Sequence, residues 1–264
     1  YPNSVMETGH DIIFFWVARM LMFGCHFTGK VPFKTVYLHA MVRDENGEKM
    51  AKMKGNVIDP LDVVFGQSDV EKLPLLLKKH FADKGEYPEG MPAFGADALR
   101  FTLVSQTAQG RDVKLAIKRV EGYKAFANKL WNATKFALMN LEGFKPSDKP
   151  ITDRKLALAD RWILSRLDVA VSETVSALEG YRFDAAASTI YQFIWAELCD
   201  WYIELAKGPL NGADKHAREA TQAGANTALF VEADSGEVLE CPVASFIWFE
   251  GDDVCAPPLA SGVL

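Results

Sequence analysis

Residues 49–54 (KMAKMK) place three lysines within six positions, and Gly55-Asn56 follows them directly. Residues 35–42, before this stretch, are apolar and β-branched as in a buried strand, and residues 44–47 have the composition of a turn. Asp59-Pro60 predicts the start of a helix. The lysines therefore belong to a mobile loop between a strand and a helix, where ammonium groups could neutralise charge that develops on a polyphosphate. A solvated basic loop without a ligand is the alternative.

A second polar group, Gly9-His10-Asp11, precedes the apolar run of residues 12–23. Thr8 and Asp11 are three residues apart and fit a capping box for a helix over this run. Because the run is apolar nearly all round, we expect a helix buried on several sides, as in the middle of an α/β layer. Asp11 then lies in the first helical turn, where it serves either as a cap or as a ligand contact.

The composition is that of a globular protein. The chain has 264 residues, of which 49% are hydrophobic and 24% are charged, and this length suits one or two domains. The net charge of −6 arises at the end of the chain, because residues 223–264 hold seven acidic side chains and no Lys or Arg. Residues 1–222 hold 29 basic and 28 acidic side chains, a balance that is compatible with an anionic partner.

The cysteine pattern and the hydropathy indicate the compartment. The four cysteines form no CxxC pair and lie far apart, at Cys25, Cys199, Cys241 and Cys255. We therefore expect no metal site, no disulfide framework and a reducing, cytoplasmic location. The apolar run of residues 12–23 contains Arg19 and is shorter than the roughly 18 residues of a membrane span. The chain opens on Tyr1-Pro2 without a methionine or a signal peptide, and we expect an internal segment of a longer protein.

Helical periodicity dominates the middle of the chain. Residues 117–207 follow three amphipathic helical periods, which predict a helical bundle. We expect Asp160 and Asp184 to cap the second and third helices, and Gly208-Pro209 to end the third. Residues 97–103 also follow a helical period.

Beyond Gln222 the pattern changes from helix to strand. Residues 226–231 and 238–239 predict one β-hairpin, and residues 245–249 and 254–255 predict a second.

The residues of the N-terminal part carry a resemblance to a known family. Residues 1–5 (YPNSV) and 9–20 (GHDIIFFWVARM) resemble the segment of valyl-tRNA synthetases, which are class I aminoacyl-tRNA synthetases, that follows the editing insertion. Residues 49–56 (KMAKMKGN), continued by VIDPLD, resemble the second signature of that family, KMSKS followed by KGN. With matching stretches at 92–103 and 119–133, the resemblance covers about residues 1–220.

The resemblance implies an α/β plus all-α fold. It assigns residues 1–58 to the end of a Rossmann-like catalytic domain, residues 59–116 to a connector that packs against the inner corner of the tRNA, and residues 117–222 to a helical anticodon-binding domain. Residues 223–264 form a foreign β-rich tail. The implied activity is that of a monomeric valine–tRNA ligase, which activates valine with ATP and Mg²⁺ and then esterifies tRNA(Val).

The resemblance also assigns roles to single residues. Lys52 binds the ATP phosphates and stabilises the transition state of adenylation, and Lys49 assists it. Gly9 and Asp11 meet the ribose of the adenylate.

Two features separate this chain from the family pattern. Ala51 and Met53 replace the two serines of the lysine signature, so we expect a modest loss of turnover. The His-Ile-Gly-His signature and the editing insertion are absent. Half of a nucleotide site does not hold valine and ATP within the roughly 3–3.5 Å that reaction demands, so we expect this chain alone to be inactive. A tRNA-binding module without catalysis is the alternative.

Arg119, Asn128 and Lys129 lie on a polar face of the first bundle helix, at the start of the implied anticodon-binding domain. Their functional interpretation is contact with the tRNA backbone, where basic side chains supply salt-dependent affinity. An ordinary solvated face is the alternative.

The tail resembles a second family. Glu240 and residues 255–264 (CAPPLASGVL) resemble a fragment of the fold-type IV aminotransferases and lyases, which depend on pyridoxal phosphate (PLP). That resemblance implies that Glu240 pairs with the pyridine nitrogen of the cofactor. Because the tail contains no lysine that could form a Schiff base, we do not expect PLP binding.

Overall fold

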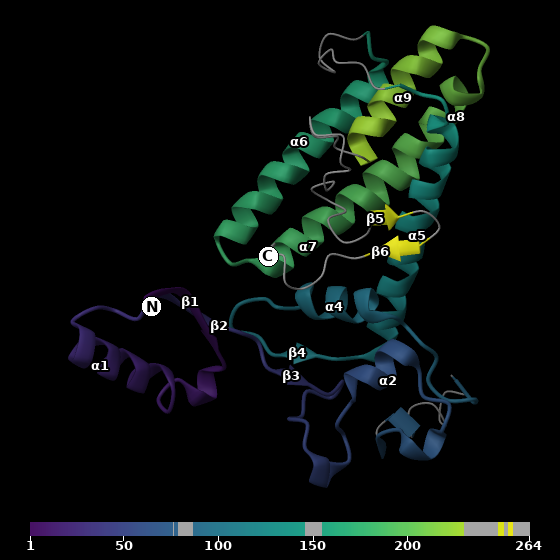
Figure 1. Ribbon diagram of the computed structural model, residues 1–264. Coiled ribbons are helices and arrows are strands. Elements are labelled where there is room, and N and C mark those ends of the chain that lie inside the picture. The colour runs from purple at the N-terminus through teal and green to yellow at the C-terminus, as the bar shows by residue number, and fades with distance from the viewer. Residues whose placement is uncertain (76, 79–86, 146–154, 230–247, 251–252, 256–264) are drawn as a thin grey trace. The chain divides into compact units, whose positions relative to one another are not determined.

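The computed structural model describes residues 1–75, 77–78, 87–145, 155–229, 248–250 and 253–255 (Figure 1). The chain divides into two compact units. Unit 1 comprises Tyr1–Ala127 and Ala177–Ala187, and unit 2 comprises Asn128–Ser176 and Ser188–Leu264. None of the helices in the described ranges is long and apolar enough to span a membrane.

Unit 1 begins with a β-α-β element (Figure 1). Strands β1 (Asn3–Thr8) and β2 (Phe33–Leu38) pair in parallel, with Val5 opposite Thr35. Parallel neighbours need a crossover connection, and helix α1 (Val17–Thr28) supplies it. This arrangement confirms the α/β character that the sequence predicted for the N-terminal part.

The start of the first helix differs from the prediction. A 3-10 turn, η1 (His10–Ile12), comes first, and α1 begins at Val17 instead of Ile12. The predicted capping box is absent, because Gly9 occupies the N-cap position of η1 and no side chain caps that turn. The hydroxyl of Thr8 instead donates to the carbonyl oxygen of Gly9, at 3.3 Å, and is therefore not available as a cap.

The predicted burial of this region is also wrong. Phe14 is 75% exposed and Phe27 is 74% exposed, and Val17 is the one residue of α1 that is buried. On β2, Leu38 is 42% exposed. The physical reason is that the sheet beside α1 has two strands in the described structure, which is too narrow to cover a helix that is apolar on all sides.

The predicted strand 35–42 is divided between two sheets. After β2 ends at Leu38, the short strand β3 (Val42–Arg43) pairs in parallel with β4 (Val113–Lys114). The first strand therefore starts earlier and ends earlier than predicted, and β3 leads directly into the lysine loop.

The remainder of unit 1 packs around one hydrophobic core. Its elements are η2 (Lys52–Lys54), α2 (Pro60–Phe65), η3 (Val70–Lys72), α4 (Ala96–Val104) and the first part of α5 (Ile117–Leu141). The core includes buried side chains from three of these segments, namely Val63, Leu99 and Val120. The predicted start of α2 is confirmed, because Asp59 accepts the N–H of Leu61 at 2.8 Å and Pro60 is the first helical residue.

Unit 2 is the predicted helical bundle. It contains the rest of α5 together with α6 (Leu158–Glu179), α7 (Phe183–Gln192), α8 (Ile203–Asn211) and α9 (Lys215–Leu229), apart from the ends of α6 and α7 that belong to unit 1. A π-helical segment, η5 (Phe193–Tyr202), joins α7 to α8 without a break. The amide of Gln222 donates to the carbonyl oxygen of Asn140 at 2.7 Å and so ties α9 to α5.

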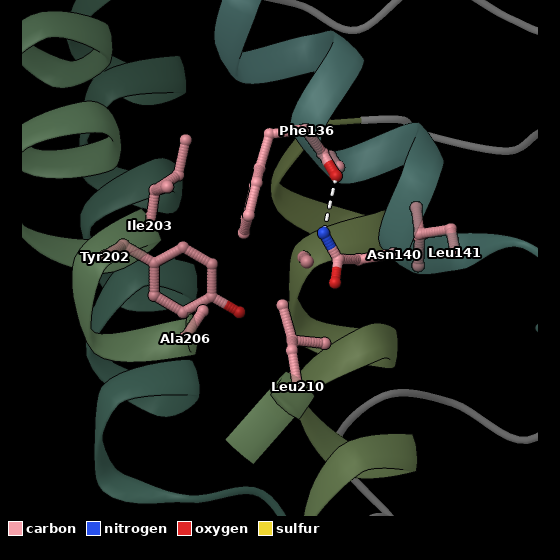
Figure 2. Close-up of a pocket in the computed structure, with 9 residues that line it drawn as sticks. Phe136, Asn140, Leu141, Tyr202, Ile203, Ala206 and Leu210 are labelled. Atoms are coloured by element: carbon pink, nitrogen blue, oxygen red, sulfur yellow. Dashed lines mark hydrogen bonds between the residues drawn. The ribbon is translucent and has the colours of Figure 1, made fainter. Parts of the chain in front are cut away.

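The interior of the bundle is closely packed (Figure 2). Tyr202 and Phe136 lie at a cavity of about 10 Å³ whose exposed lining is apolar. Asn140 stands at its edge and donates to the carbonyl oxygen of Phe136 at 2.8 Å. Such a space holds at most one water molecule, so this part of the bundle has no room for a cofactor.

Three helix ends in the bundle differ from the prediction. Asp160 is not the N-cap of α6 but lies in its first turn, where it is 1% exposed. Asp184 is likewise inside the first turn of α7. Pro209 does not stop the third helix, which runs to Asn211. A proline disrupts mainly the hydrogen bond to the preceding turn, so close to the end of a helix the last few residues stay helical.

The first predicted hairpin of the tail is wrong where the structure describes it. Residues 226–229 continue α9 to Leu229, because the segment is rich in alanine, the best helix former. The rest of that hairpin, Glu240 and residues 256–264 lie outside the described residues. The second hairpin is confirmed where the structure describes it, since β5 (Trp248–Glu250) and β6 (Asp253–Cys255) pair antiparallel, each reaching one residue further into the predicted turn. Residues 245–247 of the predicted strand lie outside the described residues.

Candidate active site

The lysine loop, residues 49–56, begins with a tight reversal of the chain. Gly47 has a φ of 86°, which suits glycine, and its N–H donates to the carbonyl oxygen of Asp44 at 2.9 Å. Arg43 and Lys49 then form an isolated antiparallel bridge. The turn predicted at residues 44–47 is confirmed, and it brings the first lysine back beside the end of β3.

Two buried polar side chains hold the backbone of the loop. Asp44 is 2% exposed and Asn56 is 6% exposed. Asp44 Oδ1 accepts the N–H groups of Asn46 at 3.1 Å and Glu48 at 2.7 Å, and its Oδ2 accepts Nδ2–H of Asn56 at 2.8 Å. Asn56 Oδ1 in turn accepts the N–H of Ala51 at 2.9 Å. Burial alone would raise the pKa of Asp44, but the hydrogen bonds from Asn56 and the backbone lower it, so the side chain is a carboxylate at neutral pH.

The middle of the loop is the 3-10 turn η2, which carries Lys52. Gly55 closes it with a φ of 63° and donates its N–H to the carbonyl oxygen of Lys52 at 3.1 Å. Met50 points inward, packs against the core of unit 1, and its sulfur accepts the N–H of Ile58 at 3.5 Å. Met53 is fully exposed. The loop backbone is therefore fixed, while Lys52 remains exposed to solvent.

The loop meets the turn before α1. Lys49 Nζ lies 3.7 Å from Asp11 Oδ2, and both side chains are substantially exposed. A Cβ added to Gly9 would lie 2.9 Å from Asp11 Oδ1 and 3.2 Å from the sulfur of Met41, so only glycine lets the carboxylate fold this closely over the backbone. The structure thus brings together three of the four predicted nucleotide-site residues, Gly9, Asp11 and Lys49, and places Lys52 one turn further along the same loop.

This arrangement suits a nucleotide. Ammonium groups on a loop with a fixed backbone offer donors to phosphate oxygens and stabilise negative charge. The exposed carboxylate of Asp11 offers acceptors to sugar hydroxyls. An exposed ion pair such as Lys49–Asp11 adds little to stability, so a ligand can separate the two groups at a small cost in free energy.

The predicted tRNA contacts lie in both units. Arg119 is exposed in unit 1, where its Nη1 donates to Gln106 Oε1 at 3.1 Å. Asn128 is exposed in unit 2. Lys129 forms an ion pair with Asp200, and its Nζ also lies 3.9 Å from the ring centroid of Trp195. Lys129 therefore has two partners inside the bundle.

The burial of Asp44 and Asn56 beneath the lysine loop was not predicted. From the sequence, Asp44 is expected in a turn and Asn56 only as part of the signature. One sequence signal could have indicated their position, namely that Asp44 stands five residues before the first lysine and Asn56 stands two residues after the last.

Family comparisons agree with this geometry. Residues 1–116 match the family described as tRNA synthetases class I (I, L, M and V). Residues 160–231 match the anticodon-binding domain of tRNA ligase, a range that takes in all of α9.

Individual proteins give the same result. The valine–tRNA ligase of Syntrophotalea carbinolica is 51% identical over 229 residues, which are 87% of this chain and 22% of that protein. The valine–tRNA ligase of Xanthomonas euvesicatoria pv. vesicatoria is 45% identical over 271 residues, which cover 98% of this chain, and so most of the tail, but 27% of that protein. The chain thus spans about a quarter of the length of these relatives.

Solved structures show the same fold. The chain matches the structure described as the ternary complex of Agrobacterium radiobacter K84 agnB2 LeuRS–tRNA–LeuAMS with a TM-score of 0.58 and 19% identity, over 87% of this chain and 25% of that chain. These three proteins are tRNA ligases, and none of them supports the PLP alternative for the tail. Residues 1–116 therefore belong to the class I tRNA synthetases and residues 160–231 to the anticodon-binding domains of tRNA ligases, and most of the chain is related to valine–tRNA ligases.

Proposed function

We propose that the longer protein to which this segment corresponds is a valine–tRNA ligase, which activates valine with ATP and then esterifies tRNA(Val). The observation that carries the proposal is the lysine loop, whose backbone is fixed and whose Lys49 meets the Asp11 turn. The printed names of the relatives supply the choice of valine among the amino acids.

In this proposal the two lysines act on the phosphates. Lys52 donates to the ATP phosphates and stabilises the charge that develops as pyrophosphate leaves, and Lys49 assists after it separates from Asp11. Asp11, held over Gly9, accepts hydrogen bonds from the ribose hydroxyls. ATP brings Mg²⁺ as its counterion. None of the described residues of this chain is proposed as a ligand of that metal ion.

The helical bundle has the second role in the proposal, which is to bind tRNA(Val). Its support is the match of residues 160–231 to an anticodon-binding domain. Exposed polar residues such as Asn128 would face the RNA, whereas Lys129 would first have to leave Asp200. The second candidate function, for the isolated chain, is a helical bundle that binds tRNA without catalysis. The reason is that the chain spans only about a quarter of the length of its relatives.

A chimeric enzyme tests the catalytic part of the proposal. Residues 1–116 would replace the aligned segment of the Syntrophotalea carbinolica ligase, and valine-dependent exchange of pyrophosphate into ATP would be measured. We expect the chimera to exchange, and Lys52→Ala to slow exchange about 100-fold or more, as the loss of one transition-state donor does elsewhere.

The matched control is Lys72→Ala, which removes an exposed lysine that pairs with the nearby Asp69 at 3.4 Å. That variant should exchange at the rate of the chimera. A folded chimera without exchange, or a Lys52→Ala variant as active as the control, would contradict the proposed role of the loop.

A further inference from the structure

We infer that Asp44 and Asn56 are positioning residues for the loop lysines, and that their mutual hydrogen bond sets the shape in which Lys49 and Lys52 meet phosphate. The inference rests on the proposed function, because it concerns how the same loop is prepared for ATP. Neither residue touches the ligand in this account, since both lie beneath the loop.

Asp44 connects the two ends of the lysine loop. Asp44 directly follows β3 and organises the reversal of the chain, because its Oδ1 accepts the backbone N–H groups of Asn46 and Glu48. Its Oδ2 faces across the loop to Nδ2 of Asn56 at 2.8 Å. One carboxylate therefore joins the chain before the lysines to the chain after them.

The carboxamide of Asn56 makes two further contacts with the loop backbone. Its Oδ1 accepts the N–H of Ala51 at 2.9 Å, and its Nδ2 also lies 3.4 Å from the carbonyl oxygen of Lys49. The single carboxamide thus fixes the backbone on both sides of Met50, whose side chain is anchored in the core. These contacts direct residues 49–52 while leaving the lysine side chains exposed.

The hydrogen bond between Asp44 and Asn56 has one possible direction. Asp44 Oδ2 has to accept and Asn56 Nδ2 has to donate, because Asn56 Oδ1 is already used by Ala51. In Asp44→Asn, an NH₂ group faces either Asn56 Nδ2 or the backbone N–H groups of the turn. In Asn56→Asp, two carboxylates face each other. Either change leaves a buried polar group without a partner, which is costly.

The same reasoning predicts a rescue. In the double variant Asp44→Asn/Asn56→Asp, the new amide at position 44 donates to the new carboxylate at position 56, and that carboxylate still accepts the N–H of Ala51. The total charge is unchanged. Only the long contact to the carbonyl oxygen of Lys49 is lost.

Limited trypsin digestion of this chain measures the effect, because the enzyme cuts after Lys49, Lys52 and Lys54 only when the loop opens locally. The masses of the fragments identify the cleavage sites. The rate of cleavage in the loop is divided by the rate after Lys207 in α8, so that local opening of the loop is distinguished from unfolding of the chain. We expect Asp44→Asn and Asn56→Asp each to raise the relative rate about tenfold or more, and the double variant to return it close to wild type.

Asp69→Asn is the matched control, since Asp69 is an exposed aspartate that accepts the N–H of Glu71 at 3.0 Å and lies outside the loop. It should leave the relative rate unchanged. Wild-type cleavage in Asp44→Asn, or a double variant as sensitive as the single ones, would overturn the inference.

A second arm of the digestion uses the chimeric ligase and adds ATP with Mg²⁺. The inference expects ATP to protect the loop in the wild-type chimera and in the double variant, and to protect the single variants less. If ATP fails to protect even the wild-type chimera, the proposed binding of ATP by the loop lysines is wrong, whereas the effect of the pair on loop opening is still read from the arm without ATP.

Discussion

At the scale of single residues, different side chains of the lysine loop hold its backbone and are proposed to bind phosphate. Asp44, Met50 and Asn56 point inward and satisfy or bury the loop backbone, and the ammonium groups point outward. Ala51 and Met53 are the positions at which the family signature has serine. Met53 is fully exposed and Ala51 is held through its backbone, so neither side chain contributes to the fixed shape.

Restoring the two serines is therefore expected to act on turnover and not on stability. In the chimeric ligase, Ala51→Ser/Met53→Ser should raise the rate of pyrophosphate exchange a few-fold, because two hydroxyl donors become available to the closed loop, each with a modest net contribution. The thermal midpoint should stay the same. Equal exchange rates with and without the serines would show that these hydroxyls have no role.

The local geometry of the lysine loop was easier to predict from the sequence than its surroundings. The spacing of Lys49 and Lys52 and the turn at residues 44–47 follow from local chemistry, which a sequence displays. The burial of Asp44 and Asn56 does not, because it depends on a hydrogen bond between residues twelve positions apart. The exposure of Phe14 also could not be predicted, since apolar periodicity shows which residues favour burial and not whether a second layer is present.

At the scale of elements, one buried carboxylate joins three helical segments of unit 2. Asp160 in α6 accepts the hydroxyl of Tyr202 in η5 at 2.9 Å, and its Oδ2 lies 3.5 Å from the hydroxyl of Thr221 in α9. Gly224 lies close beside them, and a Cβ there would lie 3.0 Å from the Tyr202 oxygen, so a larger residue would have to displace this group slightly. Burial raises the pKa of Asp160, and the hydrogen bonds from Tyr202, Ala157 and Thr221 oppose that rise without cancelling it.

This raised pKa gives the bundle a predictable response to pH. A carboxyl group whose pKa is higher in the folded state stabilises the fold fully below its unfolded pKa of about 3.9, and that contribution is lost as the pH rises through the folded value. Asp160→Asn is neutral at every pH. The free energy of unfolding of the wild type minus that of Asp160→Asn should therefore fall as the pH rises from about 4 to 7.

Urea denaturation followed by circular dichroism at several pH values gives this difference. Asp168→Asn, on the exposed side of the same helix, is the matched control for the change of residue type. A difference for Asp160→Asn that is constant or grows with pH would contradict the assignment of a raised pKa.

Helix ends were the part of the elements that the sequence predicted least well. The amphipathic periods located α5, α6 and the long α7–η5–α8 helix, because their apolar faces repeat over many residues. The ends depend on single contacts, and Asp160 shows why: the same residue type caps a helix from outside or, when buried, joins helices from within.

At the scale of the whole molecule, the chain matches two regions of proteins that are much longer than it. The class I model covers residues 1–116 and the anticodon-binding model covers residues 160–231. The exposed aromatic side chains around α1 agree with a segment whose relatives are about four times as long. A large exposed apolar surface of this kind usually faces another part of a protein. The predicted foreign tail from residue 223 stays a prediction, although both α9 and the match to the anticodon-binding domain extend past that position.

The most direct test of the account is a titration of tRNA(Val), and of an unrelated tRNA, into this chain at about 50 and 200 mM salt. Because basic side chains release counterions when they bind phosphates, the account predicts binding that weakens as salt rises and that prefers tRNA(Val) at both concentrations. Binding without any preference at either salt concentration would contradict the claim that this bundle is the tRNA-reading part of a valine–tRNA ligase.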